Sequence, residues 1–443
     1  MDASGRKKKR PAGSCSSGGP LTRREEAICT RHSPGNPRLY HARVRSITDD
    51  NRARCFFRSR SIRKGFPRFF SHVLGDDHLM NVLLLTDDDF ASRERSLIKR
   101  LEVGLSSEGV RMIQAIPSTV AHPDPAISAG VVSFAPDSLG WTPKGRCKAL
   151  AQQIESRFGG EVARGIDVVH VLGRRWWTLA QNLAEHLESA LVVEVWREQS
   201  ISHASGLLGR VATLLLASDP GLHAILTERG LGEWSRVAPW GTHAVSSPRE
   251  ILQPGVRSVM LVASGSSPAS IDPILGALRE SLADHEQTLI FADAALCPRT
   301  RFWHSARTRG LLDKLSIIDD MEGRRDLVLT GDILIVPEPA GENRSILLDA
   351  MAHAMLVIAP RDGAIQPLVS EGSVRLVTPT STWADLLRWA MSSPQEARRT
   401  AAMGWAFVRE HRKVSAHVAS VLDAYECVCS EGTLPFAARP RVR

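Results

Sequence analysis

From residue 80 onward, short runs of apolar residues alternate with segments in which apolar residues recur at helical spacing. The helical stripes include Leu97, Leu101 and Leu105; Leu150, Ile154 and Phe158; and Leu179, Leu183 and Leu187. Strands that are apolar along their whole length are typical of parallel sheets covered by helices on both faces. With right-handed crossovers, this alternation predicts a doubly wound α/β architecture.

The alternation is interrupted once, by a segment rich in Pro, Gly and Ser over 239–254. We expect strands over 82–86, 110–116, 131–134, 168–172, 191–196 and 214–217 before it, and over 258–263, 288–292, 315–318, 332–336, 356–359 and 374–377 after it. Later helices are expected over 345–353, 382–391, 394–411 and 414–425. These elements predict two Rossmann-like domains, 80–245 and 246–411, that face each other across a cleft, then a crossing helix over 412–428 and a tail over 429–443. A ligand is expected in the cleft, at the carboxyl ends of the strands.

The net charge of +8 comes from the first 79 residues. They hold 18 Lys and Arg against 7 Asp and Glu. The whole chain has 56 Lys and Arg and 48 Asp and Glu, so the residues from 80 onward hold 38 basic against 41 acidic residues. This basic tail lacks periodicity and is predicted to be disordered, and its cluster over 6–10 is of a kind that binds phosphates or anionic lipid. Because the two domains are slightly acidic, we do not expect them to bind nucleic acid. Met80 directly precedes the first expected strand, so translation starting there is an alternative.

Seven cysteines are scattered at positions 15, 29, 55, 147, 297, 427 and 429. Without paired C-x-x-C spacing, they indicate neither a disulfide framework nor a zinc site. No apolar run approaches 18 residues, and the N-terminus lacks the apolar region of a secretory signal. We therefore expect a cytoplasmic protein, and contact with the inner face of a membrane stays open.

The most informative stretch is 331–360, GDILIVPEPAGENRSILLDAMAHAMLVIAP, which predicts a buried strand, a polar loop, a helix and a second buried strand. The helix is expected to begin near Ser345, where its N–H groups and positive dipole end would suit a phosphate. Asn343 and Arg344 lie just before it and extend this candidate phosphate site. Glu342 precedes them, and Asp349 lies about one turn into the helix, where a carboxylate can accept two ribose hydroxyls. On spacing alone, both carboxylates are equally compatible with a purely structural role near the helix dipole.

This stretch resembles the C-terminal signature of glycosyltransferase family 4, which has the GT-B fold. In that family a loop Glu is followed, after seven residues, by a second acidic residue, then Ala-Met-Ala and a strand. Asp349 matches the second acidic residue, and the resemblance implies that it binds the donor ribose. Glu342 lies one residue late for the first, which contacts the donor sugar. The segments VAPWGTH over 237–243 and DVVH over 167–170 are similar to the interdomain I-P-N-G-V-D segment and the D-V-V-H strand of the family.

The chain departs from the family at the donor pyrophosphate. The family supplies an Arg and a Lys after the first strand of the second domain, where this chain has Ser264 and Ala269. Each missing charge-assisted contact is worth about 1.5–3 kcal/mol. Arg344 is the nearest replacement, and we expect further donor contacts from the hydroxyl and backbone N–H groups of Ser264 and Gly265.

Five more residues are expected on the acceptor side of the cleft or at the hinge: His170, Trp196, Arg197, Gly241 and His243. Trp196 and Arg197 occupy the region where the family often places a His near the reacting sugar. Structural roles remain open for both histidines. The sequence Asp87-Asp88-Asp89 replaces the glycine-rich acceptor loop of the family and is predicted to be a solvated turn.

The resemblance implies a glycosyltransferase that moves a sugar from a nucleotide-sugar donor to an acceptor hydroxyl, with retention of the anomeric configuration and without a metal or other cofactor. The acceptor is a glycan, a lipid or a small molecule. The missing phosphate cations favour an alternative, a catalytically degenerate GT-B-fold binding or partner protein. A phosphoacceptor receiver domain, which the three aspartates also suggest, would need a further Asp and a Lys that the first domain does not offer in the required places.

Overall fold

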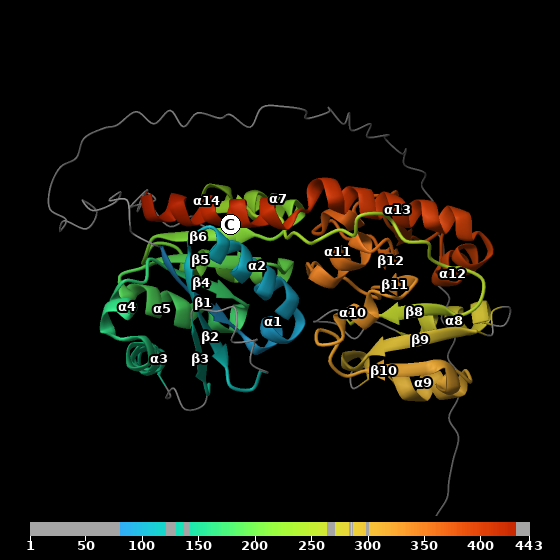
Figure 1. Cartoon of the computed structure of the whole chain (residues 1–443), viewed down its shortest axis with the longest axis horizontal. Coiled ribbons are helices and arrows are strands. Elements are labelled where there is room, and N and C mark those ends of the chain that lie inside the picture. The colour runs from blue at the N-terminus through green and yellow to red at the C-terminus, as the bar shows by residue number, and fades with distance from the viewer. Residues whose placement is uncertain are drawn as a thin grey trace, which may run out of the picture. The chain divides into compact units, whose positions relative to one another are not determined.

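The computed structural model of the chain contains two β-sheets, each built from parallel strands, with helices packed on them (Figure 1). The structure describes residues 80–120, 130–136, 142–263, 271–282, 285, 287–297 and 301–430. The predicted basic tail over 1–79 and the loop that holds Ser264, Gly265 and Ala269 lie outside the described residues. Both sheets belong to one compact unit, and the prediction of two doubly wound sheets is confirmed.

The first sheet, with its helices called the N-lobe, has the strand order β3-β2-β1-β4-β5-β6-β7. Its strands are β1 Asn81–Thr86, β2 Arg111–Pro117, β3 Gly130–Phe134, β4 Val168–Leu172, β5 Ala190–Val195, β6 Thr213–Ala217 and β7 Ser235–Val237. The order reverses at β1, which pairs in parallel with both β2 and β4, as in doubly wound folds. Strands β4, β5 and β6 are buried at every position, which explains why they are mostly apolar in the sequence, and their polar residues His170, Glu194 and Thr213 are buried as well.

The helices of the N-lobe are α1 Asp88–Arg93, α2 Arg95–Ser107, α3 Pro143–Phe158, α4 Gly160–Arg164, α5 Trp177–Leu187, α6 Glu198–Ala204 and α7 Pro220–Glu228. The prediction of a solvated turn at Asp87–Asp89 is wrong. Asp87 is 5% exposed and caps α1, because its carboxylate accepts the Phe90 N–H at 2.8 Å and the Arg175 N–H at 3.2 Å. Burial raises the pKa of Asp87.

The second sheet, with its helices called the C-lobe, has the order β10-β9-β8-β11-β12-β13. Its strands are β8 Arg257–Leu261, β9 Thr288–Asp293, β10 Leu315–Ile318, β11 Ile333–Ile335, β12 Leu356–Pro360 and β13 Arg375–Val377. Its helices are α8 Asp272–Leu282, α9 Phe302–Thr308, α10 Arg325–Val328, α11 Ser345–Ala352, α12 Trp383–Ser392 and α13 Pro394–His411. The order reverses between β8 and β11, so the loop after β11 lies at a topological switch point, where ligands of such sheets bind.

The last helix, α14 (Val414–Ser430), returns to the N-lobe and packs against α2, β5 and β6 (Figure 1). It extends beyond the predicted end at residue 425. The turn between α13 and α14 is anchored by Arg412, which is 1% exposed and donates to the Asp219 carboxylate of the N-lobe at 2.6 Å. No helix within the described ranges combines the length and apolar character needed to cross a bilayer.

Candidate functional site

Four of the predicted donor-site residues, Glu342 to Ser345, lie on the loop that joins β11 to α11 and at the first residue of that helix. This loop turns at Ala340 and Gly341, whose φ angles of 53° and 68° lie in the left-handed region. A Cβ at Gly341 would lie 2.7 Å from the Cβ of Glu198 in the N-lobe, so the close approach of the two lobes requires glycine. The residues that follow, Glu342 to Ser345, are each at most 5% exposed. The structure therefore brings these predicted residues together, but it buries them.

The start of α11 holds a carboxylate of the N-lobe. Glu94, which links α1 to α2, accepts the Ser345 N–H at 3.0 Å and the Arg344 Nε–H at 2.8 Å. We call this pair of donors, Arg344 Nε and Ser345 N, the α11 anion site. The expectation of an open helix start is wrong, since Glu94 already supplies the negative charge that the dipole favours. Although burial alone would lower the pKa of Arg344, Glu94 and Glu342 raise it, so the guanidinium stays charged.

Glu342 lies between two guanidinium groups of the N-lobe. Its Oε1 accepts from Arg93 at 2.6 Å and from Arg197 at 3.1 Å. Arg197 also pairs with Asp89 at 2.5 Å and lies over the ring of Trp196, 3.8 Å from its centroid. The predicted residues Arg197 and Glu342 are thus in direct contact, although one comes from each lobe.

Backbone hydrogen bonds join the lobes at the same place. The Asn343 N–H donates to the Trp196 carbonyl at 2.8 Å, and the Glu198 N–H donates to the Gly341 carbonyl at 2.9 Å. Arg197 and Glu342 form the antiparallel bridge between these two bonds. We call this pairing of residues 196–198 with 341–343 the interlobe bridge. It occupies the space next to Glu342, where the sequence predicted a donor sugar.

Asp349 lies one turn into α11 and is fully engaged by cations. Its Oδ1 accepts from Arg100 of α2 at 2.7 Å and from the Thr242 hydroxyl, and its Oδ2 accepts from Arg325 of α10 at 2.8 Å. Burial would raise the pKa of Asp349, but the two guanidinium groups and the hydroxyl hold it below its usual value. Arg325 also pairs with Glu322 and donates to the Ser345 hydroxyl at 3.2 Å, which connects this cluster to the α11 anion site.

A cavity of about 1130 Å³ opens beside Asp349. Residues from both lobes line it, including Arg100 of α2, Thr242 and His243 of the hinge, Arg325 of α10 and Lys413 before α14. Within the described residues, Arg325 Nε and two nitrogens of Arg100 make no hydrogen bond. Buried guanidinium nitrogens without partners favour a polar or anionic occupant.

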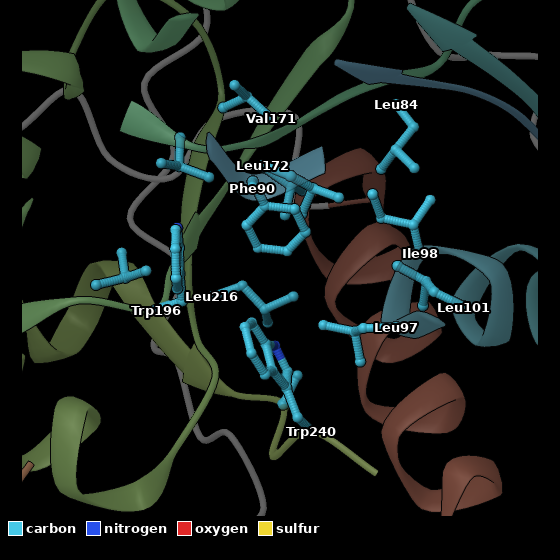
Figure 2. Close-up of a cluster of buried hydrophobic side chains, with 14 of the residues drawn as sticks. Leu84, Phe90, Leu97, Ile98, Leu101, Val171, Leu172, Trp196, Leu216 and Trp240 are labelled. Carbon is cyan, nitrogen blue, oxygen red and sulfur yellow. The ribbon is translucent and has the colours of Figure 1, made fainter. Parts of the chain in front are cut away.

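Trp196 was predicted to line the acceptor side, and the structure places its side chain in the core instead. It is 2% exposed and packs edge to face on Phe90, with ring centroids 5.1 Å apart, and beside Trp240 (Figure 2). The same cluster contains Leu97 and Leu101 of α2 (Figure 2). The aromatic rings therefore fix the position of the α1–α2 corner that carries Glu94.

For His170 the sequence left open a place on the acceptor side and a structural role, and the structure shows it fully buried. Its Nδ1 lies 2.8 Å from the Tyr425 hydroxyl of α14, and its Nε2 lies 3.3 Å from Glu194, which also accepts from Trp240 at 2.6 Å. The crossing helix covers His170, so this histidine has a structural role. His243, by contrast, is exposed and lines the cavity.

Gly241 lies in the segment between β7 and β8 that connects the two lobes, and its role there is steric. A Cβ on Gly241 would lie 2.3 Å from the Lys413 carbonyl oxygen, so only glycine permits this approach between the hinge and the α13–α14 turn.

Sequence reasoning missed Arg93, Glu94, Arg100 and Arg325, the partners of the predicted residues. The first three lie within a highly charged stretch, RERSLIKR over 93–100, on a helix whose apolar stripe predicts burial. The high density of charged side chains next to a buried apolar stripe was the only sequence signal that could have identified these residues as partners of the site. Within the described ranges, no group of three or more His, Cys, Asp or Glu side chains is arranged to hold a metal ion.

No protein family and no curated protein matches the sequence, but solved structures match the fold. HepE from Anabaena, solved with UDP and glucose, gives a TM-score of 0.60 at 14% identity over 79% of this chain and 100% of that chain. Sucrose-phosphate synthase from Thermosynechococcus elongatus gives 0.60 at 14% identity over 80% and 100%. The chain has the GT-B fold. A glycosyltransferase from Rickettsia africae gives a TM-score of 0.56 at 13% identity over 79% and 98%, and at such identities these GT-B matches establish the fold alone.

Proposed function

We propose that this GT-B protein is a glycosyltransferase that takes its sugar from a nucleotide-sugar donor. The observation that carries the proposal is the α11 anion site, where Arg344 Nε and Ser345 N together hold the carboxylate of Glu94. A diphosphate offers the same charge and the same kind of acceptor atoms to a helix start. HepE, which shares the fold, was solved with UDP and with UDP-glucose, which supports a nucleotide sugar as the donor.

The cavity beside Asp349 is the proposed place for the nucleoside. Its volume of about 1130 Å³ accommodates a molecule of this size. Asp349 is ionised near neutral pH because its pKa is lowered, so its oxygens act only as acceptors and suit two ribose hydroxyls. In the structure Arg100 and Thr242 donate to Asp349 Oδ1, and ribose hydroxyls would have to replace these hydrogen bonds.

The chemistry proposed for the site rests on charges that are already in place. Arg344 and the α11 amides would neutralise the diphosphate as it leaves, and Glu342 would stabilise positive charge on the sugar. We propose that the reaction proceeds with retention and needs no metal, as the family resemblance implies. Arg197, which holds Glu342, would orient this carboxylate.

The donor cannot enter while the lobes are joined as described. Glu94 occupies the α11 anion site, and the interlobe bridge fills the space beside Glu342. Turnover would therefore require the lobes to separate about the hinge at 241–243 and to close again over the donor.

A second candidate function follows from the same contacts. The backbone pairing of Arg197 with Glu342 and the capping of α11 by Glu94 are what a GT-B scaffold without a donor would contain. In that case the chain would be a binding or partner protein that has kept the fold and lost the reaction.

Calorimetric titration with a panel of nucleotide sugars distinguishes the two candidates. The transferase proposal predicts that wild-type protein binds one of them and that Asp349→Asn weakens binding at least tenfold. Asp219→Asn is the matched control, because Asp219 is equally buried and paired with an arginine but lies outside the site. Folded wild-type protein that binds none of the panel at millimolar concentration would favour the second candidate.

A further inference from the structure

The contacts at the α11 anion site form a reciprocal pair of ion pairs between the lobes. The N-lobe supplies Arg93 and Glu94, which are neighbours in the chain, and the C-lobe supplies Glu342 and Arg344. Arg93 pairs with Glu342 at 2.6 Å, and Glu94 pairs with Arg344 at 2.8 Å. The side chains of Glu94 and Glu342 are 0% exposed, so both pairs are shielded from water. We call these four residues the interlobe latch.

Within the latch, Glu94 has a distinct position. Its two carboxylate oxygens accept separately from a guanidinium N–H and from the first N–H of an eight-residue helix. A phosphate bound at the same place would use the same two donors. Arg93, by contrast, pairs with Asp89 of its own helix at 3.0 Å and with Glu342, which Arg197 holds as well.

We propose that Glu94 is an internal competitor of the donor diphosphate and sets the affinity and the closure of the site. In the absence of donor, Glu94 occupies the α11 anion site and the latch holds the interlobe bridge shut. When a diphosphate takes the place of the carboxylate, Glu94 leaves together with Arg93, and the bridge opens. This inference rests on the proposed function, since it concerns the regulation of the same site.

The proposal predicts different effects for the two halves of the latch. Glu94→Gln removes the competing charge while it keeps a side chain of similar size, so Arg344 loses its closest carboxylate and keeps that of Glu342 at 3.9 Å. We expect this variant to bind inorganic pyrophosphate at least tenfold more tightly than wild type. Arg93→Gln weakens the closure but leaves Glu94 in place, so we expect an affinity within threefold of wild type.

Closure is measured by amide hydrogen exchange in peptides that contain Glu198 and Asn343, whose N–H groups form the interlobe bridge. Both latch variants should exchange faster than wild type at these amides, and saturating pyrophosphate should speed exchange in wild type. Glu102→Gln is the matched control, because Glu102 is also a buried carboxylate but lies on α2 beside Gln114 of β2, within the N-lobe. It should change neither pyrophosphate affinity nor exchange at the bridge.

The outcomes separate this inference from the proposed function. Equal pyrophosphate affinity in wild type and Glu94→Gln, or an equal gain in Arg93→Gln, would overturn the competition. If Glu94→Gln binds pyrophosphate tightly and opens the bridge, yet no nucleotide sugar binds either protein, the latch is supported and the transferase proposal fails. If wild type binds a nucleotide sugar while Glu94→Gln changes neither affinity nor exchange, the transferase proposal stands and the latch is overturned. A melting curve for each variant confirms that it is folded, and Arg93→Gln tests the bridge independently if Glu94→Gln does not fold.

Discussion

His417, in the first turn of α14, provides a quantitative test of how the crossing helix is packed. It is 2% exposed, and burial lowers its pKa from 6.5 to about 3, with Arg100, His170 and Arg412 adding to the shift. The folded protein therefore keeps this imidazole neutral, whereas the unfolded chain protonates it below pH 6.5. Because the unfolded state then binds more protons, stability falls as the pH decreases from about 6.5 towards 3.

The size of the effect follows from the two pKa values. At pH 8 the side chain is neutral in both states and the contribution is zero. pH 5 lies 1.5 units below the pKa of this histidine in the unfolded chain. Protonation of the imidazole therefore stabilises the unfolded state at pH 5 by about 2 kcal/mol, and the folded protein gains no such stabilisation. This is a substantial fraction of the total stability of a typical protein, which is about 5–15 kcal/mol.

The assay is urea denaturation of wild type and His417→Leu at pH 8 and at pH 5. The substitution changes packing by an amount that is nearly independent of pH, and every other titrating group contributes equally to both proteins. We therefore expect the free energy of unfolding of His417→Leu, relative to that of wild type, to be about 2 kcal/mol higher at pH 5 than at pH 8. The same difference at both pH values would show that His417 is not buried as described.

Three further predictions concern single contacts. Burial raises the pKa of Glu102 from 4.5 to about 7, so its ionisation opposes folding as the pH rises, and Glu102→Gln should stabilise the protein to urea at pH 8 but not at pH 4. Tyr425→Phe removes the hydroxyl that lies 2.8 Å from His170 Nδ1, and should lower the free energy of unfolding by about 1–3 kcal/mol in urea titrations. Gly241→Ala places a Cβ 2.3 Å from the Lys413 carbonyl oxygen and should lower the melting temperature, with a cost of about 1–3 kcal/mol, whereas Gly206→Ala, which meets no atom within 4 Å, should not.

The fold was largely predictable because its signals are local. Strand β4 was predicted over the residues that form it, and helix α11 begins at the predicted Ser345. Both depend on apolar periodicity and on capping preferences that a few neighbouring residues determine. Strand β7 was missed, since its three residues include Ser235 and Arg236 and carry no apolar run.

The charged residues of the site were predicted mainly on the C-lobe side, and Arg197, which contacts Glu342, was the charged residue predicted on the N-lobe side. Glu342, Arg344 and Asp349 were identified from one continuous stretch, but their partners Glu94 and Arg100 lie about 250 positions away in the chain. Which charges meet across the lobes depends on the hinge and on the packing of α14, and neither leaves a local pattern. The same reason explains why the sequence left two roles open for His170, because the helix that covers it comes from the other end of the chain.

This chain has Ser264 and Ala269 where the glycosyltransferase family that it resembles has an Arg and a Lys. This difference bears on how the latch works. With fewer cations on the loop after β8, the α11 anion site rests mainly on Arg344 and the helix amides. A single internal carboxylate is then sufficient to neutralise it.

A crystal structure of the protein with a bound nucleotide sugar tests the central claim most directly. The account predicts the diphosphate at Arg344 Nε and Ser345 N, the ribose hydroxyls at Asp349, and Glu94 moved away from α11. A ligand bound elsewhere while Glu94 still caps α11, or an unchanged latch at saturating nucleotide sugar, would contradict it.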